Sequence, residues 1–177
     1  MKKVLQSGIL LLAVIAFSST AYSQGTIRFA NDPRATVTDM TTGANAAAGT
    51  QVGLYISLVG GELTLGDTAT IANPGFFNNG DVDTGLGVGS TVIVEIRAWD
   101  NPAANSYEEA LALGVGSAGV SGILNEMNLG GSGAPAPNLI TQGGMTSFAI
   151  SPVPEPSTIA LGILGGLGAM VLLRRRK

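Results

Sequence analysis

Every second residue of the segment Thr91–Trp99 is apolar, and this periodicity constrains the fold more than any other feature of the sequence. The even-numbered positions are all apolar, whereas the odd-numbered positions include Glu95 and Arg97. Because successive side chains of a β-strand point to opposite faces, the pattern predicts a strand with one face against a core. Further strands are predicted at 26–30, 51–59 and 147–150.

Each of two further runs also predicts one buried face. In the first strand, Ile27 and Phe29 share a face. In the second, alternate positions predict a common buried face formed by Val52, Leu54, Ile56 and Leu58.

Turn and loop signals separate these runs throughout the middle of the chain. Gly makes up 26 of the 177 residues, and Gly-Gly and Asn-Pro pairs recur between residues 24 and 153. The Gly-Gly pair at 60–61 and the Asn-Gly pair at 79–80 fit β-hairpin turns. Only 106–113 has a helical pattern, with Ser106 as a candidate N-cap. These signals predict a mainly β fold, a small antiparallel β-sandwich with one short helix.

The chain has no His and no Cys, which excludes imidazole and thiolate chemistry. Ser-His-Asp and Cys-His catalysis, zinc sites with such ligands and disulfides are therefore excluded. Between residues 24 and 153, three basic residues stand against eleven acidic ones, which gives a formal charge of −8. A domain with this charge would repel phosphates, so we expect no nucleic-acid partner.

The segment 114–119 reads Gly-Val-Gly-Ser-Ala-Gly and matches the G-x-G-x-x-G spacing of dinucleotide-binding loops. Such a site needs a strand before the loop, a helix after it and an acidic residue about 20 positions further on. Here a predicted helix precedes the loop, and no Asp or Glu occurs between Met127 and Pro154. We therefore expect a mobile glycine loop, and no cofactor.

Asn79, Asp81 and Asp83 place oxygen ligands at alternate positions, as in a calcium-binding loop. Counted from Asn79, the sixth and twelfth positions are Thr84 and Ser90, where an EF-hand has Gly and Glu. The favoured interpretation is an acidic hairpin loop. A weak calcium site formed by Asp81 and Asp83 stays open as the alternative.

Other chemistry has little support in the sequence. Trp99, Tyr55 and Tyr107 could stack on a sugar, although a single Trp at a strand end more commonly packs in a core. Nothing singles out a carboxylate pair for glycoside hydrolysis, so we expect no enzymatic activity. The glutamates that could supply such a pair are Glu62, Glu95, Glu108, Glu109 and Glu126.

The first 23 residues have the organisation of a secretory signal peptide. Two lysines precede the apolar run 9–17, and Ala21 and Ser23 form a small-x-small cleavage site before Gln24. The run is nine residues long, whereas a membrane-spanning helix needs about 20. We therefore predict an N-terminal signal helix at 1–23, cut by signal peptidase before Gln24.

The last 24 residues form a second export element with three parts. A Pro-Glu-Pro tripeptide comes first, apolar residues follow at 159–173, and basic residues come last. The prolines end any preceding strand, because they fix φ and have no N–H to donate. The tripeptide and the basic cluster consist of Pro154, Glu155, Pro156, Arg174, Arg175, Arg176 and Lys177.

The segment 158–173 predicts a transmembrane helix about 24 Å long, which spans a bilayer only marginally. Basic residues stay on the cytoplasmic side of a membrane, so the cluster places residues 24–153 outside. The signal peptide requires the same topology. A permanent anchor that is never cut is one alternative, and packing against another helix through Gly162 and Gly166 is a second.

This order of elements resembles the PEP-CTERM sorting signal of Gram-negative bacteria that make exopolysaccharide. The resemblance covers residues 153–177 and implies that exosortase, a membrane-embedded transpeptidase-like enzyme, recognises Pro154, Glu155 and Pro156. It also implies that Arg174, Arg175 and Arg176 are the stop-transfer cluster. Residues 89–100, followed by Ser-Tyr-Glu-Glu-Ala, are similar to a segment of secreted PEP-CTERM proteins that have no assigned activity.

We therefore expect a signal peptide at 1–23, an extracellular β-rich domain at 24–153 and a sorting tail at 154–177. The chain would be anchored transiently in the inner membrane, processed by an exosortase-like enzyme and released to the cell surface or beyond. The expected role is that of a structural component of the extracellular matrix. An exopolysaccharide-binding module is the alternative.

Overall fold

The computed structural model describes residues 24–131 and 133–154, which form nine β-strands and one α-helix. The mainly β prediction is therefore confirmed, whereas the predicted signal and transmembrane helices lie outside the described residues. In chain order the elements are β1 (Gln24–Ala30), β2 (Val37–Asp39), β3 (Gln51–Leu58), β4 (Thr64–Thr70), β5 (Asn78–Gly87), β6 (Thr91–Trp99), α2 (Tyr107–Leu113), β7 (Ser117–Ile123), β8 (Met127–Asn128) and β9 (Phe148–Pro152).

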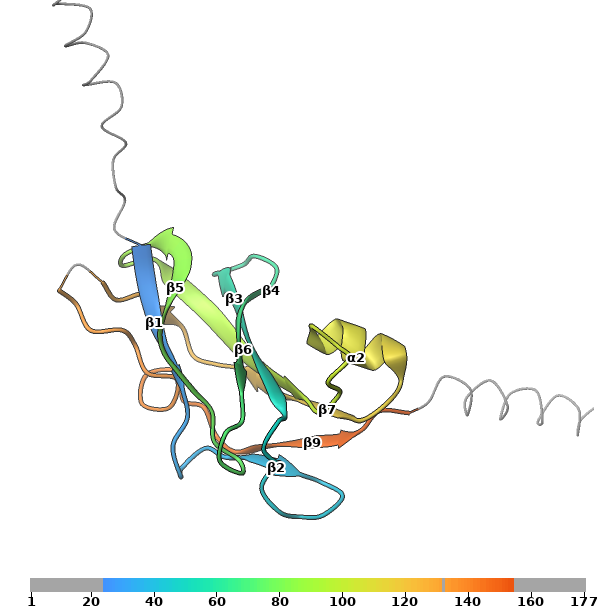
Figure 1. Cartoon of the computed structure of the whole chain (residues 1–177). Coiled ribbons are helices and arrows are strands. Elements are labelled where there is room, and N and C mark those ends of the chain that lie inside the picture. The colour runs from blue at the N-terminus through green and yellow to red at the C-terminus, as the bar shows by residue number, and fades with distance from the viewer. Residues whose placement is uncertain (1–23, 132, 155–177) are drawn as a thin grey trace, which may run out of the picture.

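The strands form two sheets of unequal size, which Figure 1 shows. The larger sheet has the order β2-β9-β7-β6-β3-β4, and β8 pairs with β6 beside this path. The smaller sheet is the antiparallel ribbon of β1 and β5. This ribbon and helix α2 lie on opposite sides of the larger sheet (Figure 1).

The expectation of a purely antiparallel sandwich is wrong at one edge, where β2 and β9 pair in parallel. The register joins Val37 to Phe148 and Asp39 to Ile150, so the two ends of the domain meet there. A parallel pair needs a long connection between its strands, and nearly the whole domain supplies it here. Local turn signals report only neighbouring strands, so they could not reveal this pairing.

The main core lies between the ribbon and one face of the larger sheet. Ile27 and Phe29 of β1 are fully buried there, and the Phe29 ring packs on Phe77 with centroids 5.1 Å apart. The even-numbered residues of β6 face the same core and are fully buried, as their alternation predicts: Val92, Val94, Ile96 and Ala98.

Strand β3 follows its predicted pattern except at its end. Val52, Leu54 and Ile56 are buried in the main core, whereas Leu58, predicted on the same face, is 50% exposed. The Gly-Gly pair at 60–61 follows directly and closes the β3–β4 hairpin. Its Gly61 N–H donates to the Leu58 carbonyl at 2.9 Å, so the hairpin turn predicted there is confirmed.

The hairpin predicted at the Asn-Gly pair 79–80 is wrong, because this pair lies inside strand β5. Gly80 has φ of 73°, and the pairing with β1 shifts register between Arg28 and Ala30. A left-handed glycine at a register shift is the signature of a β-bulge. The preference of glycine for positive φ therefore produces a β-bulge here, whereas in a hairpin it would produce a tight turn.

The glycine loop expected at 114–119 is a loop only in its first half. Gly114 ends α2 in the left-handed conformation, and the segment then enters β7, between β6 and β9. A helix before the glycines and a strand after them reverses the order of a dinucleotide-binding site. Gly119 is needed for close approach, because a Cβ on it would lie 2.1 Å from the Ala149 carbonyl oxygen.

Replacing Gly119 with alanine is expected to lower the free energy of unfolding by about 1–3 kcal/mol, because the added methyl group would push β7 away from β9. Denaturant titration measures the change. Gly87→Ala is the matched control, since a Cβ at that strand position would have its nearest contact at 3.6 Å, with Ser90 Oγ. Equal losses in the two variants would contradict the role of close packing at Gly119.

Candidate functional site

Arg97 brings charged and aromatic side chains from β3, β6 and α2 together. Its guanidinium pairs with Glu95 at 2.6 Å and also with Glu108. The same guanidinium lies over the Tyr55 ring, 4.0 Å from the centroid, and 5.5 Å from the centroid of Tyr107. We refer to Tyr55, Glu95, Arg97, Tyr107 and Glu108 as the Arg97 cluster.

The alternation of β6 and the start of α2 place this cluster on the face of the sheet opposite the main core. Ser106 caps the helix, and its Oγ accepts a hydrogen bond from the Glu109 N–H at 3.1 Å. The first helical turn then directs Glu108 to the sheet, where Tyr55 Oη donates to Glu108 Oε2 at 2.6 Å. Glu109 instead turns back to accept from the Asn105 N–H, so the two glutamates point in different directions.

Burial is the largest single influence on the pKa of both Tyr55 and Glu108. It raises the pKa of Tyr55 to about 12, and the hydrogen bond to the Glu108 carboxylate adds to this effect. Burial also opposes ionisation of Glu108. Hydrogen bonds from Tyr55 and the backbone, together with the charge of Arg97, outweigh it and hold the pKa of Glu108 below its ordinary value.

The Arg97 cluster is a set of mutual partners, in which one guanidinium pairs with two carboxylates. Glu95 and Arg97 lie on the face of β6 opposite the main core, but their side chains are only 12% and 18% exposed. Aromatic rings from β3 and α2 cover the guanidinium. A carboxylate paired in this way is stabilised as an anion, so it exchanges protons poorly near neutral pH. The pairing therefore fits a structural role, in which Glu108 joins α2 to the sheet, better than a role in proton transfer.

The stability of the protein should fall at both ends of the pH scale through this cluster. The pKa of Tyr55 is raised from 10.0 to about 12, so its contribution is complete below pH 10 and is lost as the pH rises towards 12, by up to about 2–3 kcal/mol. The pKa of Glu108 is lowered from 4.5, so its contribution is complete above that value and is lost as the pH falls below it.

Denaturant titrations between pH 3 and 12 on the wild type and Tyr55→Phe would measure these effects. The variant should start less stable at neutral pH and lose less stability between pH 10 and 12. An alkaline loss of the same size in the variant would show that Tyr55 is not its source.

Two of the three aromatic residues considered for sugar stacking, Trp99 and Tyr55, are buried inside the fold, and Tyr107 is partly buried. The Trp99 ring is 1% exposed, and its Nε1–H donates to the Ala104 carbonyl at 3.1 Å. Tyr55 is 2% exposed beneath Arg97. Core packing of Trp99 is therefore confirmed, and neither ring is open to a sugar.

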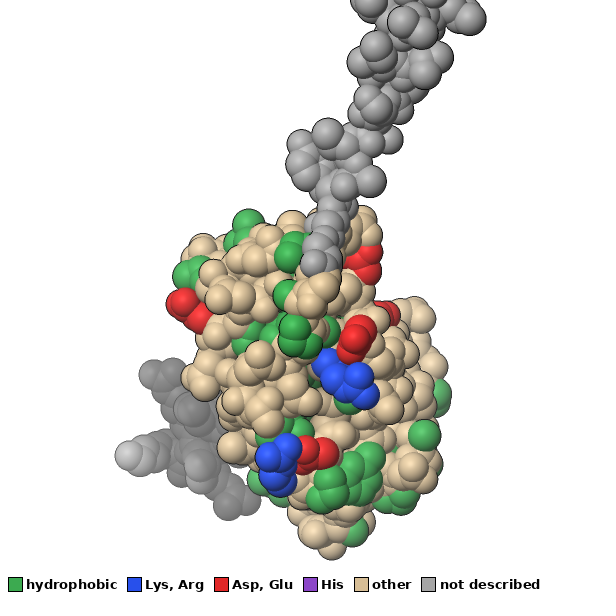
Figure 2. Space-filling view, turned by 90° about the vertical axis from the view of Figure 1, so that its left-hand side faces the viewer, with side chains coloured by type: hydrophobic (Ala, Val, Ile, Leu, Met, Phe, Trp, Pro, Cys, Tyr) green, Lys and Arg blue, Asp and Glu red, His purple; other side chains and the backbone are tan. Residues whose placement is uncertain are grey.

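Asp81 and Asp83 lie on β5, so the acidic hairpin loop predicted for them is wrong. Asp81 Oδ1 lies 3.3 Å from Arg28 Nη1, and Asp83 Oδ1 accepts from the Gly85 N–H at 2.9 Å. Figure 2 shows this side of the domain, where basic side chains lie beside acidic ones. In residues 24–131 and 133–154, no group of three or more acidic side chains could hold a metal ion.

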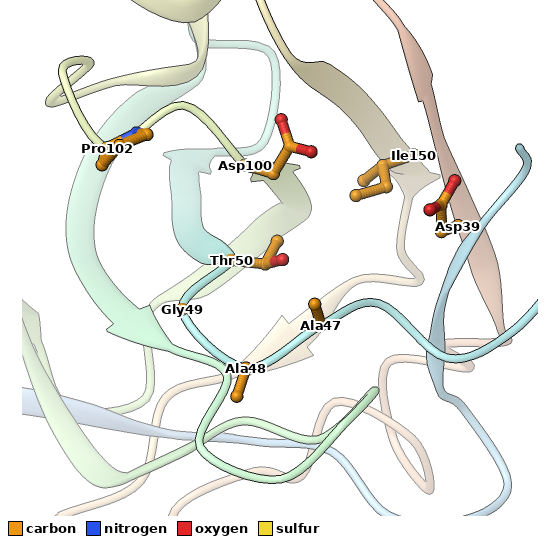
Figure 3. A pocket seen from close by; sticks show the side chains of 8 residues that line it. All are labelled: Asp39, Ala47, Ala48, Gly49, Thr50, Asp100, Pro102 and Ile150. Carbon is orange, nitrogen blue, oxygen red and sulfur yellow. The ribbon is translucent and has the colours of Figure 1, made fainter. Parts of the chain in front are cut away.

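A surface pocket of about 350 Å³ opens beside β2 and the end of β6, as Figure 3 shows. The segment 47–50 forms one wall, and Ile150 lies between the carboxylates of Asp39 and Asp100 (Figure 3). Asp39 Oδ1 accepts from the Thr41 N–H at 2.8 Å, and Asp100 accepts from a backbone N–H of β7. The pocket offers two partly engaged acceptors and no basic side chain.

The join between the domain and the Pro-Glu-Pro tripeptide is unusually short. Strand β9 ends at Pro152, and the next residue, Val153, still donates its N–H to the Gly116 carbonyl at 2.9 Å. Val153 also packs against the cluster that contains Trp99. Pro154 follows at once, so the tripeptide begins directly after the last backbone hydrogen bond.

Most of the other predicted site residues cannot be placed. Gln24, the predicted first residue of the exported protein, is the first residue of β1. The remaining residues of the predicted cleavage site, the tripeptide and the stop-transfer cluster lie outside the described residues: Ala21, Ser23, Glu155, Pro156, Arg174, Arg175 and Arg176.

Sequence reasoning missed the join at Val153 and the contact between Arg97 and Glu108. No local signal marked the second, because Arg97 lies on β6 and Glu108 on α2, and the two meet only in the folded domain. No local signal marked Val153, whose partner Gly116 is remote in sequence.

The comparisons with known proteins identify the C-terminal segment. Residues 152–177 match the family model of the PEP-CTERM protein-sorting motif. No curated protein and no solved structure matches the chain. Within the part of the chain that the structure describes, no helix is long and apolar enough to cross a membrane. The motif implies export, a membrane-anchored sorting signal and processing by an exosortase-type membrane enzyme. The chain thus carries a PEP-CTERM protein-sorting motif at residues 152–177, which begins at the last residue of β9.

Proposed function

We propose that this protein is a non-enzymatic structural component of the extracellular matrix, released from the inner membrane by cleavage near its Pro-Glu-Pro tripeptide. One observation carries the proposal: the sorting motif starts at Pro152, the last residue of a strand inside the larger sheet. Cleavage near Pro154 would deliver a folded β domain with almost no tail. A protein whose export signal directly adjoins its fold is suited to be the delivered cargo itself.

The state of the acidic side chains supports a role without catalysis. Glu95 and Glu108 are both paired to Arg97, and Asp81 is paired to Arg28. A general acid or base needs a proton-transfer site that a substrate can reach. Glu108 and Asp81 are engaged in contacts between elements of the fold, and Glu95 is engaged in a contact within β6.

Fractionation of cells that make the exopolysaccharide and the exosortase-type enzyme would test the matrix role. We expect the wild type in the extracellular polymer fraction. A variant with Pro154 and Pro156 replaced by alanine should stay in the cell envelope at full length. The matched control replaces two exposed prolines of the domain, Pro33 and Pro135, and should behave like the wild type. Wild-type protein found free in the medium, with none in the polymer, would contradict the matrix role.

The alternative function is an exopolysaccharide-binding module, and the pocket in Figure 3 is the observation that favours it. Carboxylate oxygens such as those of Asp39 and Asp100 are good acceptors for hydroxyl donors. A glycan array with the released protein separates the two functions. Binding that is lost in Asp39→Asn and kept in Asp81→Asn would favour the module, whereas no binding would favour the structural role.

A further inference from the structure

Three large apolar side chains are exposed in the short segment where α2 ends and β7 begins. Leu111 is 42% exposed, Leu113 is 45% exposed and Val115 is 60% exposed. Other apolar side chains of the same helix and turn, such as Ala110, are buried in the cluster around Trp99. We call Leu111, Leu113 and Val115 the apolar corner.

The apolar corner adjoins the point where the chain leaves the domain for its sorting motif. Gly116, the residue after Val115, accepts a hydrogen bond from the Val153 N–H at 2.9 Å. Figure 1 shows the end of α2 and the end of β9 on the same side of the domain, with the ribbon of β1 and β5 on the opposite side. The corner is therefore the part of the domain beside the anchor.

The length of the connecting chain keeps this corner close to the membrane. Five residues, 154–158, separate Val153 from the apolar run 159–173 of the membrane-anchored sorting signal. At about 3.3–3.6 Å per residue, the six steps from Val153 to the first residue of that run cover at most about 22 Å, of which the lipid headgroup layer occupies roughly 5–8 Å. The corner thus stays within reach of the lipid surface while the tail is inserted.

The charges around the corner point to neutral lipid. The last turn of α2 contains no basic residue, and its first turn contains Glu108 and Glu109. Attraction to anionic lipid needs Lys or Arg at the contact, which this helix lacks. The contact available is burial of leucine and valine side chains, which does not depend on lipid charge.

We propose that the apolar corner docks on the lipid surface while the sorting tail is inserted, and so orients the domain with Pro154 at the headgroup layer. This inference rests on the membrane-anchored stage of the proposed function. A contact of three side chains would be weak for a free domain, but the anchor makes it intramolecular and raises its effective concentration. After release the corner loses its anchor, and the domain should leave the membrane.

Single fluorescent labels on the full chain, reconstituted in phosphatidylcholine vesicles, test this docking. The chain has no Cys, so Val115→Cys gives one site for an environment-sensitive label. Ala134→Cys is the control, because Ala134 is exposed and its segment lies on the opposite side of the domain (Figure 1). We expect a blue-shifted emission and quenching by nitroxide lipid at position 115, and neither at position 134. Leu111→Ser with Leu113→Ser should reduce both signals at position 115.

The outcomes separate the docking from the anchoring. If the chain floats with the vesicles but the label at position 115 stays in water, the docking is overturned and the anchored stage stands. If the chain does not float, both are overturned. A blue shift of the emission that occurs only in vesicles containing phosphatidylglycerol, and that disappears at high salt, would contradict an apolar contact. Serine variants that slow processing in cells while position 115 shows no lipid contact would assign the corner to the enzyme and overturn docking on lipid.

Discussion

Replacing Phe29 with alanine is expected to lower the free energy of unfolding by about 3–5 kcal/mol. The Phe29 ring is fully buried and packs on Phe77, with the ring centroids 5.1 Å apart. This pair joins the ribbon of β1 and β5 to the core that it shares with the larger sheet. The substitution removes the transfer free energy of the ring and leaves a cavity that a close-packed interior fills only in part.

Denaturant titration of the variant and the wild type measures this loss. Phe76→Ala is the matched control, because Phe76 is the neighbour of Phe77 but is only half-buried. Its loss should be clearly smaller than that of Phe29→Ala. Similar losses in the two variants would contradict the assignment of Phe29 to the interface between the ribbon and the sheet.

Replacing Trp99 with alanine is also expected to cost about 3–5 kcal/mol, and to do so without any change at a binding surface. The ring is 1% exposed and packs with Ala104, Ala110 and Ala118, while Val153 packs at the edge of the same cluster. The substitution would therefore weaken the packing of α2 on the sheet and the packing of Val153, the last residue before the sorting tripeptide. Circular dichroism must follow the unfolding, because Trp99 is the only Trp in the chain.

Trp99→Phe is the control for this prediction. It keeps an aromatic ring but removes the Nε1–H that donates to the Ala104 carbonyl at 3.1 Å. A lost buried hydrogen bond costs about 1–3 kcal/mol, so this variant should be the more stable of the two. A Trp99→Ala protein as stable as the wild type that no longer bound a glycan would place the ring in a sugar site and contradict its role in the core.

The elements that sequence alone predicts are those in which the local pattern and the tertiary environment agree. In β6, one face meets a core and the other meets α2, so its alternation predicts the strand with its full bounds. Helix α2 is predicted by its cap, because Ser106 and Glu109 form their hydrogen bonds locally. Strand β1 is predicted by Ile27 and Phe29, which need only a common face.

Strands β4 and β5 escape prediction because their residues have weak strand propensity. Gly and Asp interrupt the sequence of β4, Thr64–Thr70, and the sequence of β5, Asn78–Gly87, is rich in Gly, Asp and Asn. They become strands by pairing, β4 with β3 and β5 with β1. The backbone hydrogen bonds to the neighbouring strand hold them extended although their own residues favour this conformation only weakly. The parallel pairing of β2 with β9 is missed for a related reason, since it joins segments more than a hundred residues apart.

The candidate sites divide in the same way. The sorting motif can be read from the sequence because its tripeptide, apolar run and basic cluster are defined by their order along the chain. The Arg97 cluster cannot, because Tyr55 and Glu108 are 53 residues apart and meet only when α2 packs on the sheet. The short join at Val153 likewise depends on the position of Gly116 in the folded domain.

The most direct test of the proposed function is the intact mass of the protein outside cells that make the exosortase-type enzyme. We predict a chain that begins at Gln24 and lacks residues 157–177, so that it ends close to Pro154. The matched sample from cells without the enzyme should keep those residues in the membrane fraction. Extracellular protein that retains residues 157–177 when the enzyme is present would contradict processing at the sorting motif.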